Sequence, residues 1–241
     1  MRILIPAVIL AAALAVASPA AAQATGSSSS TQKAPAKPAK PPKPKKPPVP
    51  RKPIGARAFF IVDTEFMSAS QSFTASTGSS TMFGFGGGGE ILNLWKGIFA
   101  RVAYSTASKT GERGNVVEGE FISSGFPMDI GVNTLELGAG WRTYMKKHPK
   151  VALYAGGGVL FVGYSQKSAF EPSFDAEERA TGYSVQGGLE YALSKWFTAA
   201  VEGQYRGVPG VAGIAGVSGG YDETDLGGYV IRGMVGIRFK K

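Results

Sequence analysis

The stretch GGYVIRGMVGIRF, residues 227–239, decides the fold class of this chain. Side chains along a β-strand point alternately to opposite faces, so residues two apart share a face. One parity of the stretch is apolar or glycine, and the other carries two arginines. The apolar parity reads Tyr229, Ile231, Gly233, Val235, Ile237 and Phe239, and the other includes Arg232, Gly236 and Arg238. This alternation predicts a strand with one apolar face and one face that tolerates charge.

Seven other segments alternate in the same way, and short and long connections separate them in turn. The eight predicted strands cover 56–67, 81–92, 97–108, 132–145, 151–163, 182–193, 197–207 and 227–239. Short connections lie at Asn93–Lys96, Lys146–Lys150 and Ser194–Trp196, and long ones at 68–80, 109–131, 164–181 and 208–226. This pattern is typical of an up-and-down barrel in an outer membrane. We predict an all-β fold, a closed antiparallel transmembrane barrel of eight strands over residues 55–241. Ten strands are the alternative, because the segment 115–122 could extend the third and fourth strands beyond the membrane.

One face of the predicted strands is apolar, as the lipid-facing side of a membrane barrel must be. Its residues are Phe60, Val62, Phe66, Phe83, Phe85, Ile91, Ile98, Val102, Tyr104, Leu135, Leu137, Trp141, Tyr183, Val185, Leu189, Tyr191, Phe197, Val201 and Tyr205. Aromatic residues also form two bands, near the short turns and near the long loops, which match interfacial girdles. The run at 151–163 is apolar on both parities, so its alternation leaves its orientation open.

The opposite parity carries nearly all the charges of the predicted strands. Its acids are Asp63, Glu65, Glu90, Glu136, Glu190 and Glu202, and its bases are Arg101, Arg142, Arg206, Arg232 and Arg238. The two signs nearly balance and the bases are all arginine, which suits a confined interior where guanidinium and carboxylate groups pair. An unpaired charge there would be costly. Glycines at 84, 86, 88, 138 and 140 share this parity and leave room for long side chains. We predict a lumenal charge network.

The first 24 residues have the features of a secretory signal peptide. Arg2 precedes an apolar stretch from Ile3 to Ala17, and small residues follow, so cleavage would fall after Ala22 or Ala24. An uncleaved membrane anchor is the alternative.

Residues 25–54 are rich in Ser, Pro and Lys, which predicts a disordered, extended tether in the periplasm. The segment contains no acid, and its bases are Lys33, Lys37, Lys40, Lys43, Lys45, Lys46, Arg51 and Lys52. An anionic cell-wall polymer is therefore a candidate partner, with a plain linker as the alternative. The chain's net charge of +9 belongs to this tether and the leader, because residues from 55 on are formally neutral. The charge is thus no indication of nucleic-acid binding.

The leader, the eight runs, the lumenal Arg/Glu set and the closing Tyr229-x-Ile231-x-Gly233-x-Val235-x-Ile237-x-Phe239 resemble the small outer-membrane β-barrel proteins. These are the OmpA transmembrane domain, OmpX and OmpW. The resemblance covers about residues 55–241 and is one of pattern rather than of a site motif. It implies that the barrel-assembly machinery reads the terminal aromatic, here Phe239. Lys240 and Lys241 depart from the family's aromatic end, and the basic tether is not a general family feature.

The sequence offers little for catalysis or cofactor binding. The chain has no cysteine, which excludes thiol catalysis and thiolate metal sites. A G-x-G-x-x-G match at 84–89 lies within a predicted strand rather than before a helix. A G-x-S-x-G match at 216–220 lies in a long loop, whereas the only histidine, His148, lies in a short turn at the opposite end of the predicted barrel. The histidine is therefore too distant to act as a base for that serine. Acidic segments at 171–178 and 221–225 could attract a divalent cation, although solvated loops explain them better. We predict no enzyme activity, no cofactor and no metal site.

Three functions stay open at this stage. The first is a non-enzymatic, monomeric outer-membrane barrel with a structural or surface-contact role through its long loops. The second is a narrow channel for small or apolar solutes, as a likeness to OmpW implies. The third is a soluble ligand-binding barrel. An eight-stranded barrel has an interior only wide enough for side chains, which favours the first.

Overall fold

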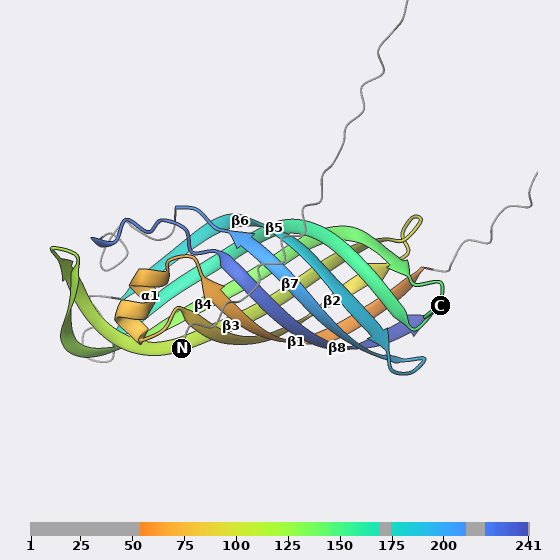
Figure 1. Ribbon diagram of the computed structural model, residues 1–241, viewed down its shortest axis with the longest axis horizontal. Coiled ribbons are helices and arrows are strands. Elements are labelled where there is room, and N and C mark those ends of the chain that lie inside the picture. The colour runs from red at the N-terminus through yellow and green to blue at the C-terminus, as the bar shows by residue number, and fades with distance from the viewer. Residues whose placement is uncertain (1–53, 169–174, 211–219, 241) are drawn as a thin grey trace, which may run out of the picture. The chain divides into compact units, whose positions relative to one another are not determined.

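The computed structural model describes residues 54–168, 175–210 and 220–240. Its eight antiparallel strands form a closed barrel in sequence order (Figure 1). The strands are β1 (Gly55–Met67), β2 (Thr81–Leu92), β3 (Ile98–Val117), β4 (Glu120–Tyr144), β5 (Val151–Ser168), β6 (Ala176–Ala192), β7 (Phe197–Gly207) and β8 (Gly228–Lys240). Because β1 pairs with both β2 and β8, the sheet has no free edge. The predicted eight-stranded antiparallel barrel is confirmed. The signal peptide expected at residues 1–24 lies outside the described residues, as do the tether expected at 25–54, apart from Ile54, and the G-x-S-x-G match at 216–220, apart from Gly220.

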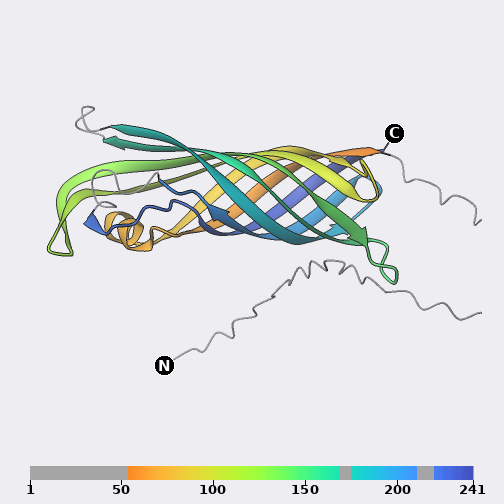
Figure 2. The ribbon, with the colours of Figure 1, turned by 90° about the horizontal axis from the view of Figure 1, so that it is seen from above.

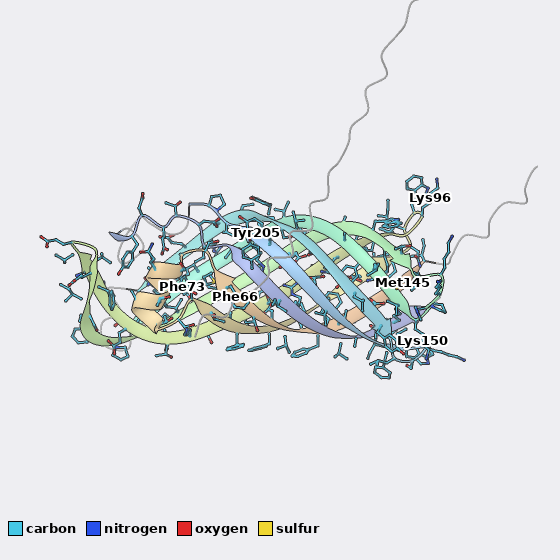
Figure 3. The ribbon with its side chains drawn as sticks, viewed as in Figure 1. Phe66, Phe73, Lys96, Met145, Lys150 and Tyr205 are labelled. Atoms are coloured by element: carbon cyan, nitrogen blue, oxygen red, sulfur yellow. The ribbon has the colours of Figure 1, made fainter. Side chains whose placement is uncertain are left out.

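The two ends of the barrel differ as the connection lengths predict. Turns at 93–97, 145–150 and 193–196 link β2 to β3, β4 to β5 and β6 to β7 at one end, the short-turn end. The other end, the loop end, carries helix α1 (Ser70–Thr77) between β1 and β2. Figure 3 shows Lys96, Met145 and Lys150 together at the first end and Phe73 of α1 at the other.

The connections predicted at 109–131 and 164–181 are wrong in length, because β3 and β4 occupy most of the first and β5 and β6 extend into the second as far as Ser168 and Ala176. β3 and β4 continue as a hairpin that reaches past the other strands at the loop end (Figure 2). A two-residue turn closes it, and both Glu118 and Gly119 have positive φ, 52° and 84°, as a type I′ turn requires. The segment 115–122 therefore extends strands three and four, and the described chain adds no ninth or tenth strand to the barrel.

The pairing of β3 with β4 is irregular in the outer part of this hairpin, where the sequence contains glycines and a proline. The register shifts between Glu112 and Gly114, and Gly125 opposite has a φ of 73°. Pro127 pairs with Glu112 on β3, whereas β4 pairs with β5 only from Met128 on. Proline cannot donate to a sheet ladder, so it is placed where one side of the strand is unpaired.

The side chains of the strands are sorted by parity. All of the residues predicted for the apolar face are exposed on the outside of the barrel except Ile98, which is half-buried. The strand whose orientation the sequence left open, β5, points Tyr154, Leu160 and Val162 inward and Val159 and Phe161 outward. β5 is apolar on both parities because Leu160 and Val162 pack into the inward apolar cluster and Tyr154 packs its ring against inward side chains.

Inward glycines allow neighbouring strands to approach closely. A Cβ at Gly86 in β2 would collide with the carbonyl oxygen of Tyr104 and lie 2.7 Å from the Cα of Ser105, both on β3. Gly203 on the outside of β7 contrasts with it, because a Cβ there meets nothing within 4 Å. The space is therefore restricted at the lumen side of the β2–β3 pair and open on the outer side of β7.

We expect Gly86→Val to destabilise the barrel by about 3 kcal/mol, since the added atoms can be accommodated only by moving the β3 backbone. Gly203→Val is the matched control and should change the free energy of unfolding by less than about 0.5 kcal/mol. Urea unfolding of both variants in lipid vesicles, followed by tryptophan fluorescence, measures the difference. Equal stability of the two variants would contradict the close approach of β2 and β3.

Candidate functional site

The barrel interior contains all eleven side chains that the sequence placed in a lumenal network. Each is buried, and the most accessible of them, Arg238, has only 9% of its surface exposed. The structure adds Arg57, which is 2% exposed and shares the inward parity of Asp63 on β1. Counting back from Asp63 in steps of two would have found it. With Arg57, six arginines face six carboxylates.

Five of these residues form a cluster nearer the short turns, called here the inner cluster. Its members are Arg57, Arg142, Arg238, Glu90 and Glu190. Glu90 lies 2.9 Å from Arg57 and 3.0 Å from Arg142. Glu190 contacts Arg57, Arg142 and Arg238 at once. Three guanidinium groups therefore share two carboxylates.

Six residues form the outer cluster, nearer the loop end, where acids are in excess. Its members are Asp63, Glu65, Glu136, Glu202, Arg206 and Arg232. Arg232 lies 3.3 Å from both Glu136 and Glu202 and 3.5 Å from Asp63. The strand register explains this position, because Arg232 pairs directly with Asp63 on one side and with Glu202 on the other. Directly opposed residues of neighbouring strands lie within reach of each other.

Arg101 joins the two clusters. Its Nε donates to Glu90 at 2.8 Å, and its Nη1 donates to Glu202 at 2.6 Å. Among the residues that the structure describes, no other ion pair connects an inner-cluster residue to an outer-cluster residue. Charge-assisted hydrogen bonds of this kind fix geometry as well as neutralising charge. Arg101 therefore makes one network of what would otherwise be two.

Three inward aromatic rings surround this arginine, and the sequence reasoning missed them. The guanidinium carbon of Arg101 lies 5.6 Å from the ring centre of Phe59, 5.7 Å from that of Phe99 and 5.6 Å from that of Tyr154. Rings at this distance attract a cation through their negative faces. Phe99 and Tyr154 also meet edge to face, with centres 6.1 Å apart.

Each ring covers a glycine on the next strand. The directly paired residues are Phe59 with Gly88, Phe99 with Gly140 and Tyr154 with Gly188. A Cβ at these glycines would lie 2.8, 2.6 and 2.5 Å from the ring carbons, too close for a side chain. The glycines provide the space in which the rings lie flat against the wall, and the rings fill the surface that the glycines leave bare.

An apolar cluster closes the interior towards the loop end. It contains Met67, Ala69, Phe73, Met82, Ala107, Met128, Ile130, Val132, Leu160, Val162, Val208 and Leu226, all buried. Below it, the cavity lined by Glu65, Arg206, Val208 and Leu226 amounts to about 10 Å³. That volume is at most enough for one water molecule.

Glu223 holds α1 in place over this cluster. Its carboxylate accepts hydrogen bonds from the backbone N–H groups of Gln71 and Ser72, at 2.9 and 2.8 Å, and from the Ser72 hydroxyl at 2.6 Å. A carboxylate is favourable at a helix N-terminus, where backbone donors are unpaired. Asp225 accepts from the N–H groups of Val208 and Gly227 at 2.8 and 2.7 Å. These two acids of the segment 221–225 therefore bind the described residues on either side of them, Glu223 to the start of α1 and Asp225 to Val208 and Gly227.

The structure places the motifs that were considered for catalysis and metal binding. The ranges 54–168, 175–210 and 220–240 contain no group of three His, Asp or Glu side chains arranged to hold a metal ion. The G-x-G-x-x-G match lies inside β2, and His148 is exposed in the turn between β4 and β5. No helix in the described part of the chain is long and apolar enough to cross a membrane.

We expect Arg101→Gln to lower the free energy of unfolding by about 3–5 kcal/mol, because it leaves Glu90 and Glu202 buried without their shared partner. Arg179→Gln is the matched control, since Arg179 is an exposed arginine on β6, and it should cost less than about 0.5 kcal/mol. The double variant Arg101→Gln/Glu202→Gln should lose less than the two single variants added together. Urea unfolding in detergent micelles measures all four. Strict additivity would show that Arg101 and Glu202 do not interact.

Comparison with known proteins finds a likeness of fold. No protein-family model matches the sequence, and a search of curated proteins gives no match. Neisserial surface protein A (NspA) aligns with a TM-score of 0.50 at 13% identity, over 78% of this chain and 97% of that chain. The N-terminal β-barrel domain of OprF from Pseudomonas aeruginosa aligns at 0.46 and 13%, over 76% and 97% of the two chains. Ail from Yersinia pestis, solved with the heparin analogue sucrose octasulfate, aligns at 0.46 and 12%, over 78% and 99%. The chain has the fold of the small outer-membrane β-barrel proteins.

Proposed function

We propose that the protein is a non-enzymatic barrel of the bacterial outer membrane, whose filled interior passes no solute and whose extended loop end makes contacts outside the cell. One observation carries this proposal: large apolar side chains are exposed on the outside of the barrel, and twelve charged side chains are buried inside it. A soluble barrel has the opposite arrangement, because water must meet its polar face. The soluble ligand-binding alternative is therefore disfavoured.

Aromatic side chains support a membrane position for the barrel. Tyr183, Tyr205 and Tyr229 form a row across β6, β7 and β8 near the loop end, with neighbouring ring centres 6.3 and 5.3 Å apart. Figure 3 shows Tyr205 and Phe66 at this level. Trp95 and Trp196 are exposed in the short turns at the opposite end. Two such levels match the two interfaces of a bilayer.

The filled interior argues against the narrow channel. The twelve charged residues, with the three rings around Arg101 among them, fill one part of the lumen. The apolar cluster beneath α1 fills the part towards the loop end. We expect the protein reconstituted in planar bilayers to show no steady conductance above that of the lipid alone. Regular single-channel openings would favour the channel instead.

The β3–β4 hairpin supports a surface-contact role. Beyond the barrel it carries Val117, Ile122 and Phe126, which are 51%, 57% and 50% exposed. Val117 and Ile122 share a face, because Val117 pairs with Glu120 two residues before Ile122. Apolar side chains exposed together on a protruding hairpin are suited to contact with another surface.

The location is tested by fractionation and by gel migration. We expect recovery in the outer-membrane fraction and a different migration of boiled and unboiled samples, because a closed barrel satisfies its backbone hydrogen bonds within lipid and resists unfolding. Recovery in a soluble periplasmic fraction without detergent would overturn the proposal.

The lipid-facing surface gives a further prediction. Val201 is 62% exposed on β7, next to Glu202, which is fully buried. Val201→Arg should destabilise the barrel in bilayers by about 2–4 kcal/mol, the cost of a charge near the bilayer midplane. Val117→Arg, on the exposed hairpin, is the matched control and should be neutral within about 0.5 kcal/mol. Refolding titrations in lipid vesicles compare them, and equal tolerance at both positions would mean that Val201 does not face lipid.

A further inference from the structure

The short-turn end of the barrel contains a pocket of 440 Å³ in addition to the charge network. Arg238, Leu92 and Tyr144 lie at its base, and Lys150 and Lys195 lie at its rim on two different turns. None of the residues that line it is an acid. Neither rim lysine makes an ion pair within the described residues. The pocket is thus a basic mouth of the lumen with a largely apolar lining.

The side chains behind this pocket leave positive charge and hydrogen-bond donors to spare. The inner cluster has three arginines for two glutamates, and Glu190, the acid that contacts Arg238, is shared with Arg57 and Arg142. The buried Nε atom of Arg238 has no hydrogen-bond partner in the described structure, and the same holds for Nε of Arg57 and of Arg142. Arg238 is the one of these three arginines that lines the pocket, and buried donors normally have partners, so its Nε is available to an anion there.

Apolar groups at the edge of the pocket indicate where the anion comes from. Ile54 and Phe239 line the pocket and are 56% and 52% exposed at the outer surface of the barrel. A ligand with a phosphate head and an apolar tail could therefore place its head on the lysines and its tail along these side chains. A free anion would gain nothing from them.

The chain's own N-terminal segment is not suited to the pocket. The segment that leads into Ile54 carries eight lysines and arginines between residues 33 and 52 and no acid. Its charge has the same sign as that of Lys150, Lys195 and Arg238, so the segment and the pocket repel each other.

We propose that this pocket binds the phosphate headgroup of an anionic phospholipid from the membrane leaflet at the short-turn end. Lys150 and Lys195 bind the phosphate, Arg238 supplies positive charge behind them, and Ile54 and Phe239 contact the first part of an acyl chain. The inference rests on the membrane location proposed above.

The test uses the full chain refolded in neutral detergent micelles and titrated with short-chain phosphatidylglycerol or phosphatidylcholine. Trp95, Trp141 and Trp196 are exposed at the short-turn end, and their fluorescence reports binding. We expect phosphatidylglycerol to bind more tightly than phosphatidylcholine. Lys150→Gln/Lys195→Gln should weaken phosphatidylglycerol binding by roughly 25-fold, about fivefold for each lysine near an anionic headgroup.

The matched control is Lys146→Gln/Lys147→Gln, which removes two charges next to Lys150 without touching the pocket lining. It should weaken binding by less than about threefold, the part that comes from diffuse attraction. An equal loss of affinity in both double variants, or equal affinity for the two lipids, would overturn the proposal that the pocket binds an anionic phospholipid. Full competition by inorganic phosphate at the same affinity would overturn the lipid as its source.

Gel migration and the need for detergent distinguish a failure of the lipid-binding proposal from a failure of the proposed membrane location. Each variant should show the wild-type difference between boiled and unboiled samples, because the substitutions lie in turns. A barrel that needs detergent but does not prefer phosphatidylglycerol would reject the pocket alone. A chain that is soluble without detergent would reject the membrane location and the pocket together.

Discussion

The interaction on which the rest of the structure depends is the pairing of Arg101 with Glu90 and Glu202 inside the barrel. Moving these charges out of water costs several kcal/mol for each ion, and only close contacts with good geometry offset that cost. The barrel provides them through its register, which places Arg101 directly opposite Glu90. The rings of Phe59, Phe99 and Tyr154 then surround the guanidinium group and exclude water from it. Arginine is suited to this position, because its fork of donors reaches two acids at once and its flat face stacks on rings.

This arrangement sets conditions on the wall of the barrel. Rings and long charged side chains occupy the lumen only where the facing positions are small, which explains why glycines pair with the aromatic residues. Charged groups, aromatic rings and the apolar cluster at the loop end fill the interior, and the opposite parity of the strands presents large apolar residues on the outside, so the surface is compatible with lipid rather than with water. The charged interior and the apolar exterior thus both result from the alternation of side chains along each strand.

The sequence predicts the strands within the apolar belt well and the parts beyond it poorly. Between the two aromatic levels, lipid on one side and charges on the other impose strict alternation, so Val201 and Glu202 could be assigned to opposite faces. Beyond the belt, both faces of the β3–β4 hairpin meet water, and no apolar alternation marks Val117 or Ile122 as strand residues. Helix α1, with the sequence SQSFTAST, lacks an apolar period, and it depends instead on Glu223 from a connection about 150 residues further along the chain.

In the candidate site, the alternation along a strand can be read from the sequence, but the pairing of residues between strands cannot. Parity identifies inward charges, and Arg57 follows the same rule as Asp63 because the two residues lie an even number of positions apart on β1. Parity alone does not show that Phe59, beside the outward Phe60, covers Gly88, because that contact depends on which residues of β1 and β2 are paired. The partition into an inner cluster with excess arginine and an outer cluster with excess carboxylate likewise depends on register. The excess arginine of the inner cluster, together with Lys150 and Lys195, makes the short-turn mouth basic. The excess carboxylates of the outer cluster lie towards the loop end. The two ends of a barrel with a neutral interior therefore differ in charge, and the basic end is the one at which β1 begins.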